Sequence, residues 1–323
     1  MSRPDTPTPI RSVAAIINPA SGGGRTGRDW PTIQRELEAV LGPVTPYFTD
    51  GPARPEHLPA ALLTRKALDA GAELLIAVGG DGTISETVNG IMLAGGTPSS
   101  VQLGLLNTGT GGDFRKSFDL AAERQACIAR MATGTTRTVD IGRLSFETDE
   151  GKRLTRYFNN IASFGLSGAV DRAINKTSFS KIFGGGFAYQ WASFKALMRY
   201  KPQPVRIRTD QGFDEVLNVS TAAIANGRFF GGGMMMAPNA LVDDGLFDLI
   251  IMKDMGIRDL ASGSGSLYDG SHIHNEKVIE TRASWVEAEP VNAKPVLLDI
   301  DGEAPGRLPA RFDILTNALT LRL

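Results

Sequence analysis

One stretch in the first third of the chain constrains the fold most strongly, because an apolar run leads directly into a cluster of glycines. The apolar run is Leu74 to Val78, and it is followed by Gly79-Gly80-Asp81-Gly82-Thr83. A continuous apolar run of this length is typical of a strand buried on both faces of a parallel sheet. Apolar residues then recur at helical spacing, at Ile84, Val88 and Ile91. The stretch predicts a buried strand, a glycine turn and the start of a helix.

The residues of this turn favour an anionic ligand. A glycine inside a regular element costs roughly 1 kcal/mol relative to alanine, so three glycines close together indicate a constraint such as close approach of the backbone to phosphate. Free N–H groups at a helix start bind phosphate, and Thr83 either caps the helix or contacts a phosphate oxygen. Asp81 repels phosphate and instead suits a magnesium ion or its bound water. The alternative is a tight turn without a ligand.

Two further strands of the first half also end in glycine-rich turns. Ser12–Ile17 precedes Asn18-Pro19-Ala20-Ser21-Gly22-Gly23-Gly24-Arg25, and Val101–Leu106 precedes Asn107-Thr108-Gly109-Thr110-Gly111-Gly112-Asp113-Phe114. Neither turn has the spacing of a P-loop or of a dinucleotide-binding G-x-G-x-x-G motif. The carboxyl ends of parallel strands lie at one sheet edge, where open α/β sheets bind ligands. Three such turns therefore predict a nucleotide or polyphosphate site.

The pattern changes after about residue 135. The first part alternates strands with helices, and it adds a strand at Val44–Phe48 and helices at Trp30–Leu41 and Leu58–Ala70. The second part has short, β-branched or alternating segments between turn residues, which is typical of an antiparallel sandwich or barrel. These segments are Val139–Phe146, Arg153–Ile161, Pro204–Arg208, Val216–Ala225, Phe247–Met252, Lys277–Ala283, Val296–Ile300 and Ala310–Leu323. We therefore predict an α/β domain over residues 1–134 and an all-β domain over 135–323, with the boundary near Gly134.

A helical pattern interrupts the second part between Phe187 and Tyr200. Phe187, Trp191, Phe194 and Met198 share one face, and basic residues flank it. One interpretation is a helix packed on the sheet. The other is an apolar wall for an apolar substrate, whose basic flanks meet anionic head groups at a membrane surface.

Two acidic stretches in the second part are candidates for chemistry. In the first, Asp299 and Asp301 are expected to point the same way on a strand that Gly302 ends, with Glu303 beside Asp301. Paired carboxylates near a phosphate site suit general base catalysis on a hydroxyl and the ordering of metal-bound water. The alternative is an acidic hairpin tip. In the second stretch, Asp243-Asp244-Gly245 is either a bare tight turn or a site for a hard cation.

Composition excludes several classes of protein. The net charge of −1 leaves no broad basic field for nucleic acid. The single cysteine, Cys127, excludes a disulfide framework and a cysteine-rich zinc site. His272 and His274 are two apart, so we expect them on one strand face as a solvated pair. We find no apolar run long enough to span a membrane and no signal peptide, and we expect a soluble, cytoplasmic protein that meets a membrane only from its surface.

Taken together, these stretches resemble the catalytic family of diacylglycerol kinases and sphingosine kinases, in its bacterial lipid kinase branch. The resemblance runs nearly end to end. Its most specific pieces are Gly79-Gly80-Asp81-Gly82-Thr83 with Glu86 and Asn89, Gly109-Thr110 with Asp113-Phe114, Asn226-Gly227 with Gly231-Gly232-Gly233-Met234, Ala237-Pro238, Asp244-Gly245-Leu246-Phe247-Asp248, and Asp301-Gly302-Glu303.

The resemblance implies a Rossmann-like nucleotide-binding α/β domain, a β-sandwich domain and an active site in the cleft between them. It implies magnesium-dependent transfer of the γ-phosphate of ATP to a lipid hydroxyl. Asp81 would order the catalytic magnesium through water, Asp301 would be the general base and Glu303 its partner. A structural magnesium would use Asp244 and the carbonyls of Leu241 and Leu246. The nucleotide would be surrounded by Asn18, Ser21, Thr49, Gly79, Gly80, Gly82, Thr83, Gly109 and Thr110.

The chain departs from the family pattern in the third glycine turn. Asn107 stands where the family usually has proline, and Gly112 stands where it usually has asparagine. Both residues change the third turn, so nucleotide affinity or acceptor preference can differ from that of the family. The sequence leaves open which lipid alcohol is the acceptor and whether the protein forms a homodimer. Two other hypotheses compete: a kinase of a soluble acceptor such as NAD, and a catalytically silent protein that binds nucleotide or lipid.

Overall fold

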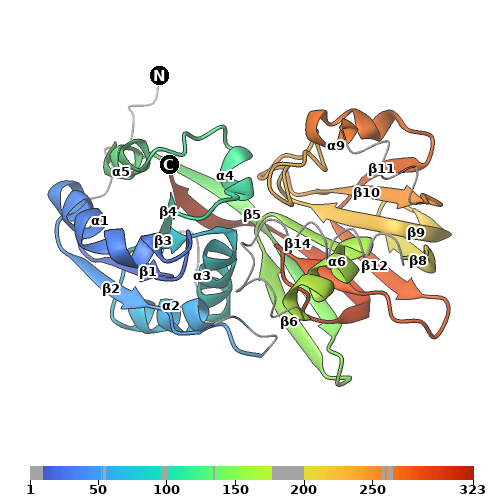
Figure 1. Ribbon diagram of the computed structural model, residues 1–323, viewed down its shortest axis with the longest axis horizontal. Coiled ribbons are helices and arrows are strands. Elements are labelled where there is room, and N and C mark those ends of the chain that lie inside the picture. Colours follow the sequence, from blue (N-terminus) through green and yellow to red (C-terminus); the bar gives the residue numbers. More distant parts are fainter. Residues whose placement is uncertain are drawn as a thin grey trace. The chain divides into compact units, whose positions relative to one another are not determined.

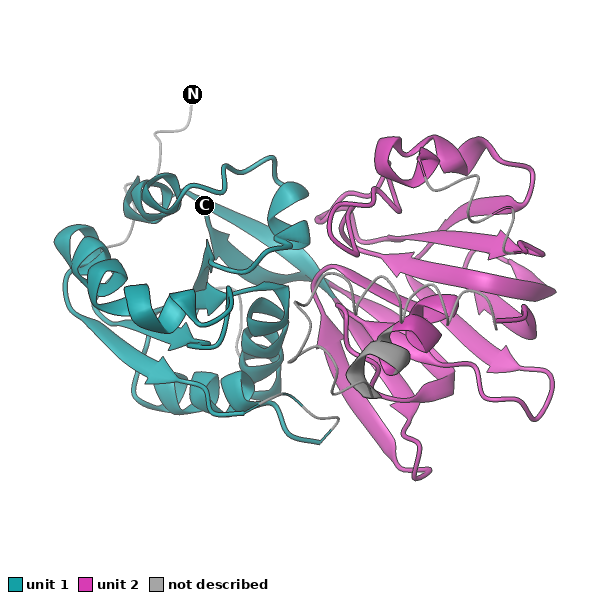
Figure 2. Cartoon of the chain, viewed as in Figure 1, with its two compact units in different colours: residues 1–141, 316–323 teal, residues 142–315 magenta. Residues whose placement is uncertain are grey.

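The computed structural model describes residues 10–51, 53, 56–95, 100–133, 135–176, 200–256, 259 and 265–323 (Figure 1). The chain forms two compact units, the first containing residues 1–141 and 316–323 and the second residues 142–315 (Figure 2). Residues 316–323 thus belong to the first unit. The predicted division at a single boundary near Gly134 had assigned them to the second domain. A strand pattern reveals a strand but not its partner, so the sequence did not show this return.

The sheet of the first unit is parallel, as predicted. Its strands lie in the order β2-β1-β3-β4, and the end of β14 (Arg307–Arg322) pairs parallel with β4. Every residue of β1 and β3 is buried, which explains why these strands are continuous apolar runs. The strands are β1 (Val13–Ile17), β2 (Val44–Phe48), β3 (Leu74–Gly79) and β4 (Gln102–Asn107).

The helices of the first unit follow its strands, and three of them were expected. Helix α1 begins at Arg25, ahead of the predicted Trp30, because its polar first turn shows no apolar periodicity. Helices α2 and α3 pack so closely that a Cβ on Gly90 would lie 2.6 Å from the Thr64 Cβ. Glu86 accepts the Ala60 N–H at 2.7 Å and so caps α2. The helices are α1 (Arg25–Leu41), α2 (Pro59–Asp69), α3 (Asp81–Leu93), α4 (Asp113–Lys116) and α5 (Arg124–Thr133).

The second unit is an antiparallel β structure, as predicted. The expected strand Arg153–Ile161 is in fact two strands separated by Asn159 and Asn160, and β12 was not predicted. Its strands are β5 (Thr136–Glu147, which begins in the first unit), β6 (Arg153–Phe158), β7 (Ile161–Gly165), β8 (Gln203–Thr209), β9 (Asp214–Ala225), β10 (Phe247–Lys253), β11 (Val278–Ala283), β12 (Trp285–Pro290), β13 (Leu298–Ile300) and the first part of β14. The helical segments that lie wholly within its described residues are α6 (Leu166–Lys176), α9 (Ser266–Asp269) and the 3₁₀ helix η2 (Ser271–His274).

Aromatic side chains fill the core of the second unit. Phe158 stacks on Phe247 with ring centroids 5.5 Å apart, and Phe164 stacks on Phe312 at 6.4 Å. All four rings are fully buried. They come from β6, β7, β10 and β14, so the core joins strands that are far apart in the sequence.

Two expectations have a different outcome. His272 and His274 lie in η2 rather than on a strand, and His272 is buried with its ring nitrogens 3.0 Å from the Met236 carbonyl and 3.3 Å from the Ser266 carbonyl. The solvated pair was therefore a wrong prediction. The helix expected from Phe187 to Tyr200 lies outside the described residues, apart from Tyr200. None of the helices in the described part of the chain is both long and apolar enough to cross a membrane.

Candidate active site

The three glycine turns of the first unit lie together at the carboxyl ends of β1, β3 and β4. The Asn18 N–H donates to the Val78 carbonyl at 3.0 Å, which joins the first turn to β3. The Thr108 N–H donates to the Gly79 carbonyl at 2.8 Å, and Thr26 Oγ1 donates to Thr108 Oγ1 at 2.7 Å. The turns therefore converge on one sheet edge, as the strand–turn pattern predicted.

The second turn supplies backbone donors for an anion. Helix α3 begins at Asp81, so the N–H groups of Asp81 and Gly82 belong to its first turn. N–H groups of a first turn have no carbonyl acceptor within their own helix. Such groups, with the positive end of the helix dipole, attract anions. Gly80 is the N-cap and has an extended backbone.

Thr83 and Gly79 have a packing role at this turn. Thr83 is only 3% exposed, and a Cβ on Gly79 would lie 2.2 Å from its Oγ1. Gly79 is therefore required because the Thr83 side chain lies against it. The N-cap of α3 is Gly80 and has no side-chain cap hydrogen bond, so of the two alternatives for Thr83 the structure does not support the cap.

The first turn is shaped by Asn18. The Asn18 Oδ1 accepts the Ala20 N–H at 3.0 Å, which tightens the chain between β1 and α1. The Ser21 Oγ lies 4.0 Å from the position of a Cβ on Gly80, so the first and second turns touch there. Thr49 directly follows β2, and its N–H donates to the carbonyl of Ile17 in β1 at 2.8 Å. These residues thus border the same edge of the sheet.

Asp81 connects the second turn to the third. Its Oδ2 accepts the Gly112 N–H at 2.7 Å and its Oδ1 accepts the Phe114 N–H at 3.3 Å. A carboxylate oxygen has two lone pairs, so each oxygen keeps an acceptor site beyond these bonds. Magnesium in phosphate sites is typically held by one or two carboxylates, water and substrate phosphate. The half-buried Asp81 fits such an ion by its donor chemistry.

A cavity of about 330 Å³ opens beside the third turn. Two of its guanidinium groups, Arg25 and Arg115, have no carboxylate partner among the described residues. Arg25 Nε donates to the Gly22 carbonyl at 3.1 Å, Arg115 donates to the Leu120 carbonyl, and the Arg115 Nε is buried without a partner. The cavity is lined by Arg25, Thr26, Asp29, Ile33, Asn107, Thr108, Gly109, Thr110, Gly111, Arg115, Ala122 and Arg124.

This cavity favours an anionic ligand. Of its three arginines, Arg124 is the one with a carboxylate partner in the described part of the chain, since it pairs with Glu36 at 2.7 Å. Asp29 is the single acidic residue of the lining. Sequence reasoning missed both Arg25 and Arg115 as site residues. A usable signal was present, since Arg25 directly follows the glycines of the first turn and Arg115 follows Asp113-Phe114 in the third.

Asp301 lies in the second unit, at the tip of a two-residue turn. Its φ is 48° and that of Gly302 is 90°, and Ile300 and Glu303 exchange backbone hydrogen bonds of 2.8 and 2.9 Å across the turn. The carboxylate accepts N–H groups from Asn159 at 3.4 Å, Asn160 at 3.3 Å and Ile161 at 3.1 Å. Those three donors orient the Asp301 carboxylate.

The expectation that Asp299 and Asp301 share a strand face does not hold. Strand β13 ends at Ile300, so the alternation of side chains stops before Asp301. Asp299 is buried, with Oδ2 accepting the Ser163 hydroxyl at 2.8 Å and Oδ1 accepting the Gly302 N–H at 2.9 Å. Asp299 therefore stabilises the turn that presents Asp301, and Glu303 follows on the other side of that turn.

The Asp244 carboxylate is paired with a positively charged side chain of the same chain, that of Arg282. The Asp244 Oδ1 accepts the Leu246 N–H at 3.1 Å, and its Oδ2 pairs with Arg282. Arg282 also lies 3.5 Å from Asp248, its direct partner in the β10–β11 ladder. The carboxylate and the carbonyls of Leu241 and Leu246 are the hard oxygen donors that magnesium prefers. The donor set thus fits by type, while Arg282 competes for the same carboxylate.

Asp248 predicts a pH dependence of stability. Burial raises the pKa of its carboxyl to about 6, above the value of about 3.9 expected in the unfolded chain. Its contribution to stability is therefore full below about pH 4 and is lost as the pH rises through 6. We expect the free energy of unfolding of the wild type, relative to Asp248→Asn, to fall by about 2 kcal/mol between pH 4 and 7. Urea denaturation of both proteins at several pH values measures this difference in the free energy of unfolding. A difference that does not change with pH would contradict the expectation.

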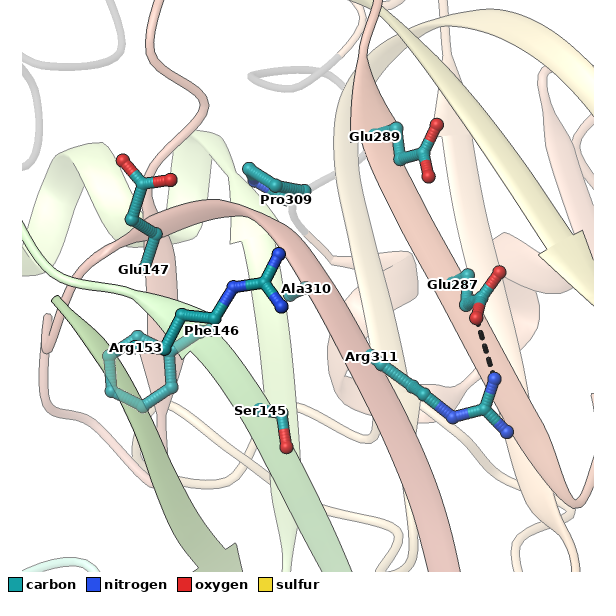
Figure 3. Close-up of a pocket in the computed structure, with 9 residues that line it drawn as sticks. All are labelled: Ser145, Phe146, Glu147, Arg153, Glu287, Glu289, Pro309, Ala310 and Arg311. Atoms are coloured by element: carbon teal, nitrogen blue, oxygen red, sulfur yellow. Dashed lines mark hydrogen bonds and ion pairs between the residues drawn. The ribbon is translucent and has the colours of Figure 1, made fainter. Parts of the chain in front are cut away.

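The second unit has an open cavity of about 280 Å³ that no predicted site residue lines (Figure 3). Most of its charged side chains are in ion pairs, one of them within the lining and the others with arginines outside it. Glu287 accepts from Arg311 at 2.6 Å, the contact dashed in Figure 3, and Arg208 pairs with Glu289 at 2.9 Å. Glu147 pairs with Arg307 at 2.7 Å. Arg153 is exposed, so the cavity has the character of a solvated charged face.

The predicted site residues thus fall into two groups. The nucleotide residues and Asp81 all lie in the first unit. Asp301, Glu303 and the Asp244 turn lie in the second unit.

Comparison with known proteins agrees with the two-part organisation. Residues 12–144 match the model of the diacylglycerol kinase catalytic domain, and residues 160–323 match the YegS C-terminal NAD kinase beta sandwich-like domain. A solved structure of a diacylglycerol kinase from Bacillus anthracis has a TM-score of 0.70 at 19% identity and covers 98% of this chain and 97% of that one. A second structure from that organism has a TM-score of 0.76 at 21% identity, with 100% and 98% covered. These structures show the shared fold.

Curated relatives are similar to this chain in sequence over most of its length. A diacylglycerol kinase from Staphylococcus epidermidis is 31% identical over 305 residues, which cover 94% of this chain and 89% of that protein. A diacylglycerol kinase from Mycobacterium tuberculosis is 27% identical over 311 residues, covering 96% and 94%. The chain therefore belongs to the diacylglycerol kinase family and, with it, to the phosphotransferases that act on an alcohol group.

Proposed function

We propose that this protein transfers the γ-phosphate of ATP, with magnesium, to the hydroxyl of a lipid of the diacylglycerol type. The observation that carries the proposal is the convergence of three glycine turns beside a cavity lined by two arginines, Arg25 and Arg115, for which the described residues offer no carboxylate partner. Phosphoryl transfer needs the phosphates to be positioned and their charge neutralised, and it needs an oriented hydroxyl. The family membership supports the same reaction.

In this proposal, the residues of the first unit bind the triphosphate. The N–H groups of Asp81 and Gly82 point at a phosphate from the start of α3, and Arg25 and Arg115 pair with its oxygens. Magnesium held near Asp81 would neutralise the charge that develops on the phosphates. The remaining predicted nucleotide contacts are Asn18, Ser21, Thr49, Gly79, Gly80, Thr83, Gly109 and Thr110, of which the buried Thr83 acts by supporting the turn.

The residues of the second unit act on the acceptor. Asp301 takes the proton of the lipid hydroxyl as that oxygen attacks the γ-phosphorus, and the bond from phosphorus to the β,γ-bridging oxygen breaks. The three backbone N–H groups that bind Asp301 keep its carboxylate in one orientation. Glu303 is its proposed partner. A lipid acceptor implies contact with a membrane surface, so we propose a cytoplasmic protein that associates peripherally with lipid.

The proposed acceptor is tested against a soluble one by labelling. Purified protein is incubated with γ-labelled ATP, magnesium and either a total lipid extract in mixed micelles or NAD, and the products are separated by chromatography. We expect label in a lipid band and none in NADP. The YegS-type sandwich match keeps the soluble acceptor as the second candidate. Labelling of NAD alone would favour it, and binding of ATP without any transfer would favour a silent binding protein.

We also propose a structural magnesium at Asp244, which predicts a stabilising effect of the metal. An ion that binds only the folded state raises its stability by mass action. We expect a chelator to lower the melting temperature of the wild type and to leave that of Asp244→Ala unchanged. Arg282→Ala is the matched variant, because it removes the competing cation and should enlarge the chelator effect. If the chelator leaves the melting temperature of the wild type unchanged, the proposed magnesium site is wrong. The Asp244 turn is then a tight turn held by Arg282 alone.

A further inference from the structure

The two residues that depart from the family pattern, Asn107 and Gly112, lie against each other in the third glycine turn. Asn107 ends β4, and its Oδ1 accepts the Gly109 N–H at 3.0 Å. Its Nδ2 lies 2.1 Å from the position of a Cβ on Gly112. The carboxamide therefore occupies the space into which a side chain at position 112 would extend. Since only the oxygen accepts from an N–H group, the Gly109 bond also sets the orientation of the amide.

Gly112 in turn holds Asp81. Its N–H donates to the Asp81 Oδ2 at 2.7 Å, and a Cβ on the preceding Gly111 would lie 2.7 Å from that same oxygen. The φ of Gly112 is 68°, a conformation that side chains disfavour. A continuous series of contacts therefore runs from the Asn107 carboxamide through the turn to the Asp81 carboxylate.

The same turn forms one wall of the arginine-lined cavity. Asn107, Gly109 and Gly111 all line it, together with Arg25 and Arg115. A shift of the turn would move the cavity wall and the Asp81 carboxylate at the same time. Asn107 thus contacts this turn at two places, Gly109 and Gly112, in addition to the backbone bonds that join Thr108 and Gly109 to the Gly79 carbonyl.

We propose that Asn107 is a positioning residue that acts as a unit with Gly112 and holds the Asp81 carboxylate toward the metal and phosphate site. The catalytic consequence rests on the proposed kinase function, whereas the coupling of the two residues does not. Asn107 acts through the turn, and Asp81 is the group that meets the metal-bound water. The Asn107 side chain fits in this turn because position 112 is a glycine and has no side chain.

A double-mutant cycle tests the coupling. Gly112→Ala is expected to lower the melting temperature, because the new methyl group meets the Asn107 carboxamide. Asn107→Ala makes room for that methyl group, so the double variant is expected to be more stable than the sum of the single effects predicts. Gly95→Ala is the matched control, since Gly95 has a φ of 70° and a Cβ there meets nothing within 4 Å. Its effect should add to that of Asn107→Ala.

The positioning role has its own readout, the magnesium dependence of turnover. We expect Asn107→Ala to raise the half-saturating magnesium concentration by about fivefold or more, with a smaller change in the KM for ATP, because Asp81 loses its orientation. Asn107→Asp, which keeps the acceptor oxygen for the Gly109 N–H, should recover part of the loss. An additive cycle overturns the coupling, and an unchanged magnesium dependence in Asn107→Ala overturns the positioning role. If the wild type shows no turnover, the proposed function fails, while the melting cycle still decides the coupling.

Discussion

Asp301→Asn is expected to lose most of its turnover, by about 10³-fold, while its affinity for ATP stays within about threefold of the wild type, since general base catalysis contributes 10²–10⁴-fold. An amide cannot take the proton of the acceptor hydroxyl. Nucleotide binding is spared because its predicted residues belong to the first unit, whereas Asp301 belongs to the second. Steady-state turnover and titration with a fluorescent ATP analogue measure the two effects separately.

The control for this variant is Asp214→Asn, which also removes a carboxylate from the second unit. Asp214 is exposed and pairs with Arg206 at 2.7 Å. Exposed pairs contribute little to stability, so this variant should keep both turnover and melting temperature. Because the amide introduces a donor among three N–H groups, Asp301→Ala is made alongside it. Near-normal turnover in either Asp301 variant would remove Asp301 from the role of base.

The second large effect concerns Arg25 and Arg115. Each single change to alanine is expected to weaken ATP binding by about 10- to 100-fold, because a charge-assisted hydrogen bond contributes about 1.5–3 kcal/mol. The double variant should bind ATP with a weaker dependence on salt, since fewer charge contacts are screened. Isothermal titration at two salt concentrations measures both quantities.

Arg28→Ala is the matched control for the arginine variants. Arg28 is exposed on α1, close to Arg25 in sequence, and does not line the cavity. We expect its ATP affinity to match that of the wild type. Full affinity in the double variant of Arg25 and Arg115 would place the triphosphate elsewhere and remove the main support for the proposed function.

The strongest local patterns predicted most of the fold. Leu74 to Val78 formed a fully buried strand, and the three strand–turn pairs formed a parallel sheet with their turns together. These features depend on short-range rules, such as apolar runs and glycine at turns. The return of β14 to β4 depends on a pairing over more than two hundred residues, which no local pattern encodes.

The candidate site was predicted only in part, for a related reason. Gly80, Asp81 and Gly109 stand out by residue type, and they do lie at one edge. Arg25 and Arg115 are next to the glycine turns in the sequence, but the pairing of their charges is a property of the fold, which gives them no carboxylate partner within the described residues. Thr83 shows the opposite case: its position in the motif indicates a ligand contact, while the structure buries it against Gly79.

The most direct test of the central claim is transfer of the labelled γ-phosphate from ATP to purified diacylglycerol in mixed micelles with magnesium. The account predicts a labelled phospholipid whose amount grows with enzyme and time and which disappears with a chelator or in Asp301→Asn. ATP that is bound by the protein but never transfers its label to this or any other lipid alcohol would contradict the account.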